Sequence, residues 1–342
     1  MDNHIVIIGA GHASGMLAIL LRKNKFDGNI TIIGDESFFP YQRPELSKGY
    51  LLDKIKQNSL SLRKQSFYEE RNIEVLLNTS AIKINKKEKN IYLDNGKSIP
   101  YKTLVIATGS INNKINISSK SKDIFYLRSI SDADKFKKSL KGIKNLGIIG
   151  SGYIGLEVAS FASQEGINVQ IIEHDDRVMS RTASPFISDF FHSKHKDASV
   201  VFHFNHTVTD IENIKNFQRI ICSNGNYFDV DAVLIAIGVR PNISLAEEAG
   251  LKCSNGIIVN DYCLTSDIDI FAIGDCTNHT NQILGKQLRL ESVHNAVEQA
   301  KTVASYISGN PKAYNQVPWF WSDQCGIKLK IAGILDNFDN HF

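Results

Sequence analysis

The sequence predicts an α/β protein with two Rossmann-like domains and a shortened α+β segment at its C-terminal end. Two observations support this prediction. A buried strand, a glycine loop and a helix follow one another within residues 4–23, and the same order returns within residues 146–165. Each copy leads into a further short apolar strand, which indicates a βαβ unit and a parallel sheet.

Length and composition exclude several classes of protein. The chain has 342 residues, 42% hydrophobic and 22% charged, a globular balance with more length than one core usually organises. A net charge of +3 is too small to indicate nucleic-acid binding. The first residues have neither a basic segment nor a long apolar segment, so we expect no secretory signal, and no apolar run reaches the roughly 18 residues of a membrane helix. The five scattered cysteines include no CxxC pair, so we expect a cytoplasmic protein that binds neither nucleic acid nor membrane.

The first half of the chain alternates strands with a helix around an antiparallel insertion. Short apolar runs predict buried strands at residues 4–9, 30–33 and 104–107. A helix is expected at residues 12–23. Residues 72–100 alternate apolar and polar around Asn/Gly turns, as an antiparallel excursion does, and the polar residues 111–122 indicate a linker.

The second half repeats this order. Apolar runs predict strands at residues 146–149, 169–172, 233–236, 270–273 and 329–332. Helices are expected at residues 153–165 and at about 292–307, and a second antiparallel excursion has its turn at residues 223–225. From residue 311 the composition changes to Pro and Trp.

These segments predict a split domain with an insertion. We expect residues 1–112 and 241–310 to form a first domain in two parts, and residues 113–240 to form a second domain between them. Residues 311–342 are expected to be a partial C-terminal domain.

The loop Gly-Ala-Gly-His-Ala-Ser at residues 9–14 has the spacing of a dinucleotide-binding fingerprint. Gly9 allows the tight turn, and Gly11 lets the backbone approach a pyrophosphate at the helix N-terminus. Ser14 replaces the third glycine, and a small residue there still permits close packing of helix on strand. Alone, this pattern also fits a glycine-rich turn of any α/β protein.

The loop Gly-Ser-Gly-Tyr-Ile-Gly at residues 150–155 repeats the fingerprint with all three glycines. In both copies, acidic residues end the next strand about 20 residues on, the spacing of a ribose-binding carboxylate: Asp35, Glu36 and Glu173. Two fingerprints predict two dinucleotides. A flavin dinucleotide and a nicotinamide dinucleotide are the pair that exchange electrons, so we expect FAD and NAD.

Acidic residues around the second fingerprint predict NADH rather than NADPH. Glu173 can accept hydrogen bonds from both ribose hydroxyls, whereas a 2′-phosphate would bring negative charge to the same place. Asp175 and Asp176 add carboxylates. Arg177 argues the other way, because it could fold back toward a phosphate, and Arg181 could contact the pyrophosphate instead.

Five further segments carry a resemblance to a known family: residues 41–48 (Tyr-Gln-Arg-Pro-Glu-Leu-Ser-Lys), 107–109, 152–157, 274–275 and 289–293. Together they resemble the FAD-dependent NAD(P)H:ferredoxin reductases of bacterial oxygenase systems, over essentially the whole chain. Glu45 stands where that family usually has a second proline. The resemblance implies a glutathione-reductase-like fold, in which we expect FAD on the domain of residues 1–112 and 241–310 and NAD on the domain of residues 113–240. It also implies electron flow from NADH through FAD to a one-electron carrier, a [2Fe–2S] ferredoxin or a rubredoxin, that serves an oxygenase.

The resemblance also implies roles for single residues. Lys48 would lie near the reactive edge of the flavin, and Glu157 would lie in reach of Lys48 and the nicotinamide carboxamide. These two are the expected catalytic residues, although without the resemblance they would be interpreted as solvated surface charges. The expected cofactor-binding residues, fingerprint and strand-end positions included, are Gly9, Gly11, His12, Ala13, Ser14, Asp35, Glu36, Arg43, Lys48, Ala81, Ala107, Thr108, Gly109, Gly150, Gly152, Tyr153, Ile154, Gly155, Glu157, Glu173, Arg181, Gly238, Gly274, Asp275, Glu291, Ser292, Val293 and Trp321.

Other functions stay open at this point. An NADH oxidase or a flavin reductase with another acceptor would use the same cofactors. A disulfide reductase is disfavoured, because no cysteine precedes Cys222. The family's third domain continues several dozen residues past the position of residue 342, so a truncated flavin-binding protein without turnover is a further alternative. The ten histidines form no ligand-spaced cluster, which predicts no metal site, and His192 and His195 are expected on a solvated helix face.

Overall fold

The computed structural model describes residues 3–119 and 121–335, and this part of the chain divides into two compact units. The first unit contains the described residues up to Gln42, Gln57–Ile111 and Arg240–Phe320. The second unit contains Arg43–Lys56, Asn112–Val239 and the described residues from Trp321. Of the predicted C-terminal segment, residues 336–342 lie outside the described residues. The assignment of predicted domains to FAD and NAD stays a prediction.

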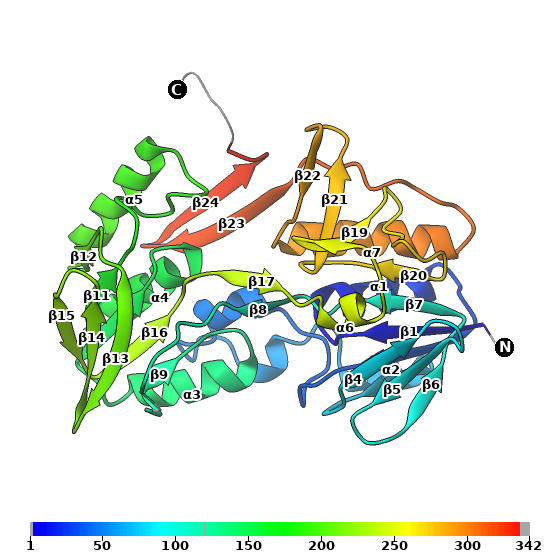
Figure 1. Cartoon of the computed structure of the whole chain (residues 1–342), viewed down its shortest axis with the longest axis horizontal. Coiled ribbons are helices and arrows are strands. Elements are labelled where there is room, and N and C mark those ends of the chain that lie inside the picture. The colour runs from blue at the N-terminus through cyan, green and yellow to red at the C-terminus, as the bar shows by residue number, and fades with distance from the viewer. Residues whose placement is uncertain (1–2, 120, 336–342) are drawn as a thin grey trace. The chain divides into compact units, whose positions relative to one another are not determined.

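The first unit is built on a parallel sheet with the strand order β20-β7-β1-β2-β3 (Figure 1). Its strands are β1 His4–Ile8, β2 Asn29–Ile33, β3 Ile73–Leu76, β7 Thr103–Ile106 and β20 Ile270–Ala272. The central strand β1 places Val6 level with Thr31 on one side and with Leu104 on the other. Both faces of the sheet are covered, which explains why the strands are continuous apolar runs.

Successive side chains of β1 enter two different cores. Ile5 packs in one core with the helices α1 His12–Lys23 and α7 Val293–Ile307, which lie side by side (Figure 1). Val6 packs in the other core, together with apolar residues of the antiparallel sheet formed by β4 Ala81–Asn85, β5 Asn90–Leu93 and β6 Ser98–Pro100. The sheet is therefore buried from both sides and fixes the position of the loop that follows β1.

The second unit repeats the arrangement with a parallel sheet in the order β12-β11-β10-β16-β9. Its strands are β9 Ile124–Phe125, β10 Asn145–Ile149, β11 Asn168–Ile172, β12 Val201–His203 and β16 Ala232–Ile235. The helix α4, Tyr153–Gln164, follows β10 directly, as α1 follows β1. Ile149, Ile172 and Ile235 pack in one core with residues of the antiparallel sheet formed by β13 Val208–Ile214, β14 Phe217–Cys222 and β15 Tyr227–Val230.

The remaining elements connect and cover these sheets. In chain order they are η1 Arg43–Ser47, η2 Gln57–Ser59, α2 Gln65–Glu70, β8 Ser110–Asn112, α3 Ile130–Leu140, α5 Pro185–Asp197, β17 Val239–Pro241, α6 Ser244–Glu248, β18 Cys253–Ser254, β19 Gly256–Val259, β21 Thr277–Asn281, β22 Lys286–Leu288, β23 Trp319–Gln324 and β24 Ile327–Ala332.

The predicted α/β fold with two Rossmann-like sheets is confirmed, and the predicted strands and helices begin and end within two residues of the observed ones. The expectation that His195 faces solvent is wrong. Its ring is fully buried on α5, and Nε2 lies 3.1 Å from Oε1 of Gln324 on β23. No helix in the described part of the chain combines the length and apolar character that crossing a bilayer requires.

Candidate functional site

The first glycine loop joins β1 to α1 and is held by close backbone contacts. Gly9 has a φ of +104°, and a Cβ there would lie 2.3 Å from the carbonyl oxygen of Ala107, so only glycine fits. Gly11 differs. It precedes α1 in an extended conformation, and a Cβ on it would meet no described atom within 4 Å. The helix start also has no side-chain cap. The loop therefore leaves open space in front of a helix start that no described side chain caps, which suits a phosphate.

Other predicted cofactor residues lie against this loop. A Cβ at Gly274 would lie 3.2 Å from the Cβ of Ala13. Asp275 follows Gly274, accepts a hydrogen bond from Ser110 Oγ at 3.0 Å, and its charge opposes the burial that lowers the pKa of His12. Nδ1 of His12 is buried with no hydrogen-bond partner among the described residues. An orphaned polar atom beside an open glycine fits a polar ligand.

Several predicted residues of the first unit have contacts of their own. Glu36 accepts a hydrogen bond from Tyr41 Oη at 2.8 Å, and Thr108 Oγ1 donates to the carbonyl of Asn242 at 2.7 Å. Ser292 caps α7, because its Oγ accepts from the N–H of Asn295. The remaining predicted positions lie at element ends or in loops: Asp35, Ala81, Gly109, Glu291 and Val293.

The second glycine loop joins β10 to α4. Gly150 has a φ of +99°, and a Cβ there would lie 2.7 Å from the carbonyl oxygen of Ala236. A Cβ at Gly155 would lie only 2.3 Å from the carbonyl oxygen of Gly150. Gly152 is again open, since a Cβ on it would meet no described atom within 4 Å, and the start of α4 has no side-chain cap. Both units therefore present a cradle that a dinucleotide phosphate fits.

Side chains around the second loop are ordered by hydrogen bonds. Glu173 Oε2 accepts from the N–H and the hydroxyl of Ser151, both at 2.6 Å. Arg177 donates to the carbonyls of Ala183 and Ser180 and to the hydroxyl of Ser188.

The tied Arg177 is thus no longer an argument for a 2′-phosphate pocket. The predicted residues Arg181 and Gly238 lie together, because a Cβ on Gly238 would be 3.3 Å from the Arg181 guanidinium. Tyr153 Oη lies 3.4 Å from the carbonyl of Thr182, and the side chain of Ile154 is exposed.

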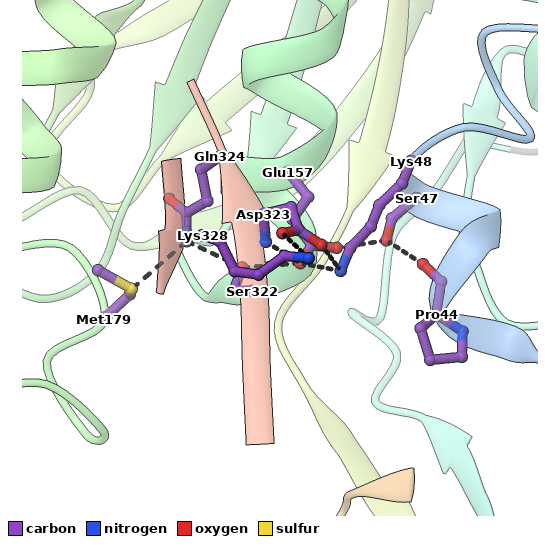
Figure 2. Close-up of polar contacts among 9 residues, drawn as sticks. All are labelled: Pro44, Ser47, Lys48, Glu157, Met179, Ser322, Asp323, Gln324 and Lys328. Carbon is purple, nitrogen blue, oxygen red and sulfur yellow. Dashed lines mark hydrogen bonds and ion pairs between the residues drawn. The ribbon is translucent and has the colours of Figure 1, made fainter. Parts of the chain in front are cut away.

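Lys48 and Glu157, the two expected catalytic residues, form an ion pair within the second unit (Figure 2). Lys48 Nζ lies 3.3 Å from Glu157 Oε1. Glu157 stands on the first turns of α4 and is 7% exposed. Ser47 Oγ donates to Oε2 at 2.5 Å, and Ser322 Oγ donates to Oε1 at 2.7 Å. The carboxylate is thus fully hydrogen-bonded where it is buried.

Burial raises the pKa of Glu157, and the nearby Lys48 charge and the two serine hydroxyls oppose that rise. The ring of Trp321, another predicted residue, lies 5.5 Å from Lys48 Nζ. Arg43 donates to the carbonyl of Arg128 at 2.7 Å. The fold therefore brings Lys48, Glu157 and Trp321 together, whereas the hydrogen bond of Arg43 is to the backbone of Arg128.

The sequence did not indicate three residues of this cluster: Ser47, Ser322 and Asp323. Lys48 Nζ lies 2.9 Å from Asp323 Oδ2, closer than to Glu157. Ser47 lies inside the segment 41–48 that carried the resemblance, and Ser322 and Asp323 directly follow Trp321. Their position next to predicted site residues could have indicated them, whereas their own residue types, which are common at a protein surface, could not.

A family model matches most of the chain, and several known proteins match nearly all of it. The family model described as pyridine nucleotide-disulphide oxidoreductase matches residues 3–300. Putidaredoxin reductase of Pseudomonas putida is 35% identical over 99% of this chain and 82% of its own length. Rubredoxin-NAD(+) reductase of Pseudomonas putida is 36% identical over 98% of this chain and 88% of its own.

A solved structure of a ferredoxin reductase has the same fold as this chain. The crystal structure of the ferredoxin reductase for the CYP199A2 system from Rhodopseudomonas palustris has a TM-score of 0.96 and 38% identity. The match covers 99% of this chain and 84% of that one. The likeness therefore extends over nearly all of this chain and most of each relative.

Proposed function

This chain belongs to the pyridine nucleotide-disulphide oxidoreductase family, and we propose that it is an FAD-dependent NADH:ferredoxin reductase. It takes electrons from NADH and delivers them one at a time to a ferredoxin-type carrier, a [2Fe–2S] ferredoxin or a rubredoxin, that serves an oxygenase. We place it in the cytoplasm. FAD, when bound, supplies the chemistry that accepts a hydride and releases single electrons.

One observation carries the proposal. Gly11 and Gly152 lie in the loops that follow the central strands of two separate parallel sheets, and each faces open space at a helix start without a described side-chain cap, so the chain has places for two dinucleotides. Glu173 and its neighbours Asp175 and Asp176 favour NADH over NADPH in the second place.

The chain's cysteines argue against a disulfide reductase. Cys263 and Cys276 are completely buried, and burial raises the pKa of Cys276 to about 11. The pKa of Cys222, Cys253 and Cys325 is also raised, mainly by burial. Thiolates are the nucleophiles of disulfide exchange, so thiols held protonated are poorly suited to it.

Within the proposed function, Lys48 and Glu157 act on the bound cofactors. The Lys48 ammonium stabilises negative charge that develops during reduction, and Glu157 holds Lys48 in place from a buried position. Ser47 and Ser322 fix the rotamer of Glu157. The protein thereby contributes position and charge.

The decisive experiment is anaerobic titration of the FAD-loaded protein with NADH, followed by reoxidation with ferredoxins and rubredoxins. We expect NADH to bleach the flavin absorbance and one of these carriers to restore it. A flavin that NADH does not bleach contradicts the proposal and indicates a protein without turnover. A flavin reoxidised rapidly by O₂ and by neither carrier indicates an NADH oxidase.

Lys48→Ala sharpens this test. Removing one charge contact to the developing anion should slow flavin reduction on the order of a hundredfold or more and change flavin content little. Lys194→Ala is the control, because Lys194 is a half-exposed lysine of α5 whose ion-pair partner is Asp197 of the same helix. Stopped-flow rates within about twofold of wild type for Lys48→Ala would contradict the assignment.

A further inference from the structure

Lys48 has a second carboxylate partner that the proposed function does not use. Its Nζ lies 2.9 Å from Asp323 Oδ2 and 3.3 Å from Glu157 Oε1. The two carboxylates come from different elements, β23 and α4, and meet at the one ammonium (Figure 2). The side chain of Lys48 is only 12% exposed. A mostly buried cation is thus held from two sides.

The backbone of Asp323 also contacts the Glu157 carboxylate. The N–H of Asp323 donates to Glu157 Oε1 at 3.3 Å, the oxygen that also accepts from Ser322. On its outer side, Asp323 Oδ1 lies 3.8 Å from Lys328 Nζ. Any change in the charge of Glu157 is therefore felt directly by Asp323 and Lys48.

The exposure of the two carboxylates differs. The side chain of Asp323 is 36% exposed, whereas that of Glu157 is 7% exposed and its pKa is raised by burial. If Glu157 takes up a proton, Lys48 loses one counter-charge. A mostly buried ammonium without any partner is strongly unfavourable, but Asp323 remains beside it.

A pocket of about 380 Å³ reaches this cluster within the second unit. Ser47, Lys48, Glu157, Ser160, Asp323 and Lys328 are among the residues that line it. Five other titratable groups of the described residues line this pocket with Glu157. Lys48 and Lys54 come from the segment Arg43–Lys56, and Asp323, Cys325 and Lys328 come from the hairpin of β23 and β24. A proton can therefore pass between solvent and Glu157 without unfolding of the cluster.

We propose that Asp323 is a positioning residue that keeps the Lys48 ammonium in place while Glu157 gains and loses a proton. The inference rests on the proposed function. There, one NADH and two oxidised one-electron carriers give NAD⁺, two reduced carriers and one proton. Glu157 accepts that proton on its carboxylate and releases it to solvent through the pocket, and Asp323 supplies the counter-charge meanwhile.

The test uses Asp323→Asn in the full, FAD-loaded, oxidised protein. Infrared difference spectra against pH follow the carbonyl band of protonated Glu157, assigned by its absence in Glu157→Gln. In Asp323→Asn, Glu157 is the one described carboxylate that remains beside Lys48, and the negative charge of Asp323 no longer repels it. The charged form of Glu157 is therefore favoured. We expect its titration midpoint to fall by about one pH unit, a tenfold change in proton affinity.

The rate of flavin reduction by NADH provides the second measurement. Below the midpoint, Lys48 in Asp323→Asn has no carboxylate partner, and we expect the rate to fall about tenfold or more. Above the midpoint, Glu157 holds Lys48 and the rate should approach that of wild type. A structural defect would lower the rate equally at every pH. Asp323→Glu keeps the charge and should restore both the profile and the midpoint.

Asp229→Asn is the matched control. Asp229 is 37% exposed, pairs with Arg219 at 2.8 Å in the same unit, and does not line the pocket. Its replacement should change neither the midpoint nor the pH profile.

If Asp323→Asn behaves as Asp229→Asn in both measurements, or loses rate uniformly, the inference is wrong. If NADH does not reduce wild-type flavin, the proposed function fails instead, and the Glu157 midpoint still reports on Asp323.

Discussion

The loops at residues 9–14 and 150–155 each join a buried strand to a helix, and they differ at the last position of the fingerprint. Ser14 is fully buried and its hydroxyl donates to the carbonyl of Gly11 at 2.8 Å. At Gly155, even a Cβ would approach the carbonyl of Gly150 to 2.3 Å. The third glycine is therefore required where the Gly150 carbonyl lies against the helix, whereas the first loop accommodates a serine that bonds to the carbonyl of Gly11.

The acidic residue after the second strand is also used differently. In the first unit, Glu36 accepts from the hydroxyl of Tyr41, outside the loop. In the second, Glu173 accepts two hydrogen bonds from Ser151, the middle residue of the Gly-Ser-Gly turn. Ala10 occupies the corresponding place in the first loop and has no hydroxyl to offer. The second loop is thus tied to its strand-end carboxylate by two hydrogen bonds.

Valine at the second glycine of each loop should have the largest effect. Gly11 and Gly152 have extended φ and ψ angles that valine adopts, and no described atom crowds a Cβ there. We expect both variants to fold, Gly11→Val to lose FAD, and Gly152→Val to keep FAD but lose NADH. Each affinity should fall more than about a hundredfold, since the side chain fills the phosphate's place.

Flavin absorbance per protein after gel filtration measures the first loss, and an NADH titration of oxidised protein measures the second. Circular dichroism is the control for folding. Stoichiometric FAD in Gly11→Val would show that the first loop does not bind its pyrophosphate. The flavin itself should be released into the supernatant when wild-type protein is precipitated with acid, because we expect non-covalent binding.

Nicotinamide preference tests the tied carboxylate. We expect kcat/KM for NADH to exceed that for NADPH by on the order of a hundredfold, and Glu173→Gln to reduce the ratio, because a 2′-phosphate no longer meets a carboxylate. Arg177→Gln should leave the ratio unchanged, since its guanidinium is bound to Ala183, Ser180 and Ser188. Equal wild-type values, or a preference for NADPH, would refute this interpretation.

Alanine at the last fingerprint position should lower the stability of the protein more in the second loop than in the first. Gly155→Ala places a Cβ against the Gly150 carbonyl and should lower the free energy of unfolding by about 2–3 kcal/mol. Thermal unfolding followed by circular dichroism measures it. A variant with the wild-type Tm would show that α4 shifts freely from its loop.

Ser14→Ala is the counterpart with the smallest expected effect. It removes one buried hydroxyl and its hydrogen bond to Gly11, together worth about 1 kcal/mol. The same thermal unfolding measurement applies. A loss as large as that of Gly155→Ala would mean that the serine, like the glycine, is indispensable to its loop.

The fold was predictable because strands buried on both faces leave continuous apolar runs in the sequence. The Lys48–Glu157 pair came from a resemblance, whereas Asp323 could not be predicted. It lies 275 positions from Lys48 on β23, and a long-range ion pair leaves no periodic pattern. The burial of His195 was not predicted for the same reason. Its helix face has the polar composition of a solvent-exposed face, but His195 contacts Gln324 of the distant strand β23.

The helix α4 carries both the open Gly152 at its start and Glu157 within its second turn. Their separation is therefore set by helical rise, about 1.5 Å per residue, and their relative direction by about 100° per residue. One residue inserted between them would leave the phosphate cradle intact yet turn the carboxylate away from Lys48. The chain thus encodes the distance between its dinucleotide-binding loop and its buried acid as a count of residues, which substitution preserves and insertion does not.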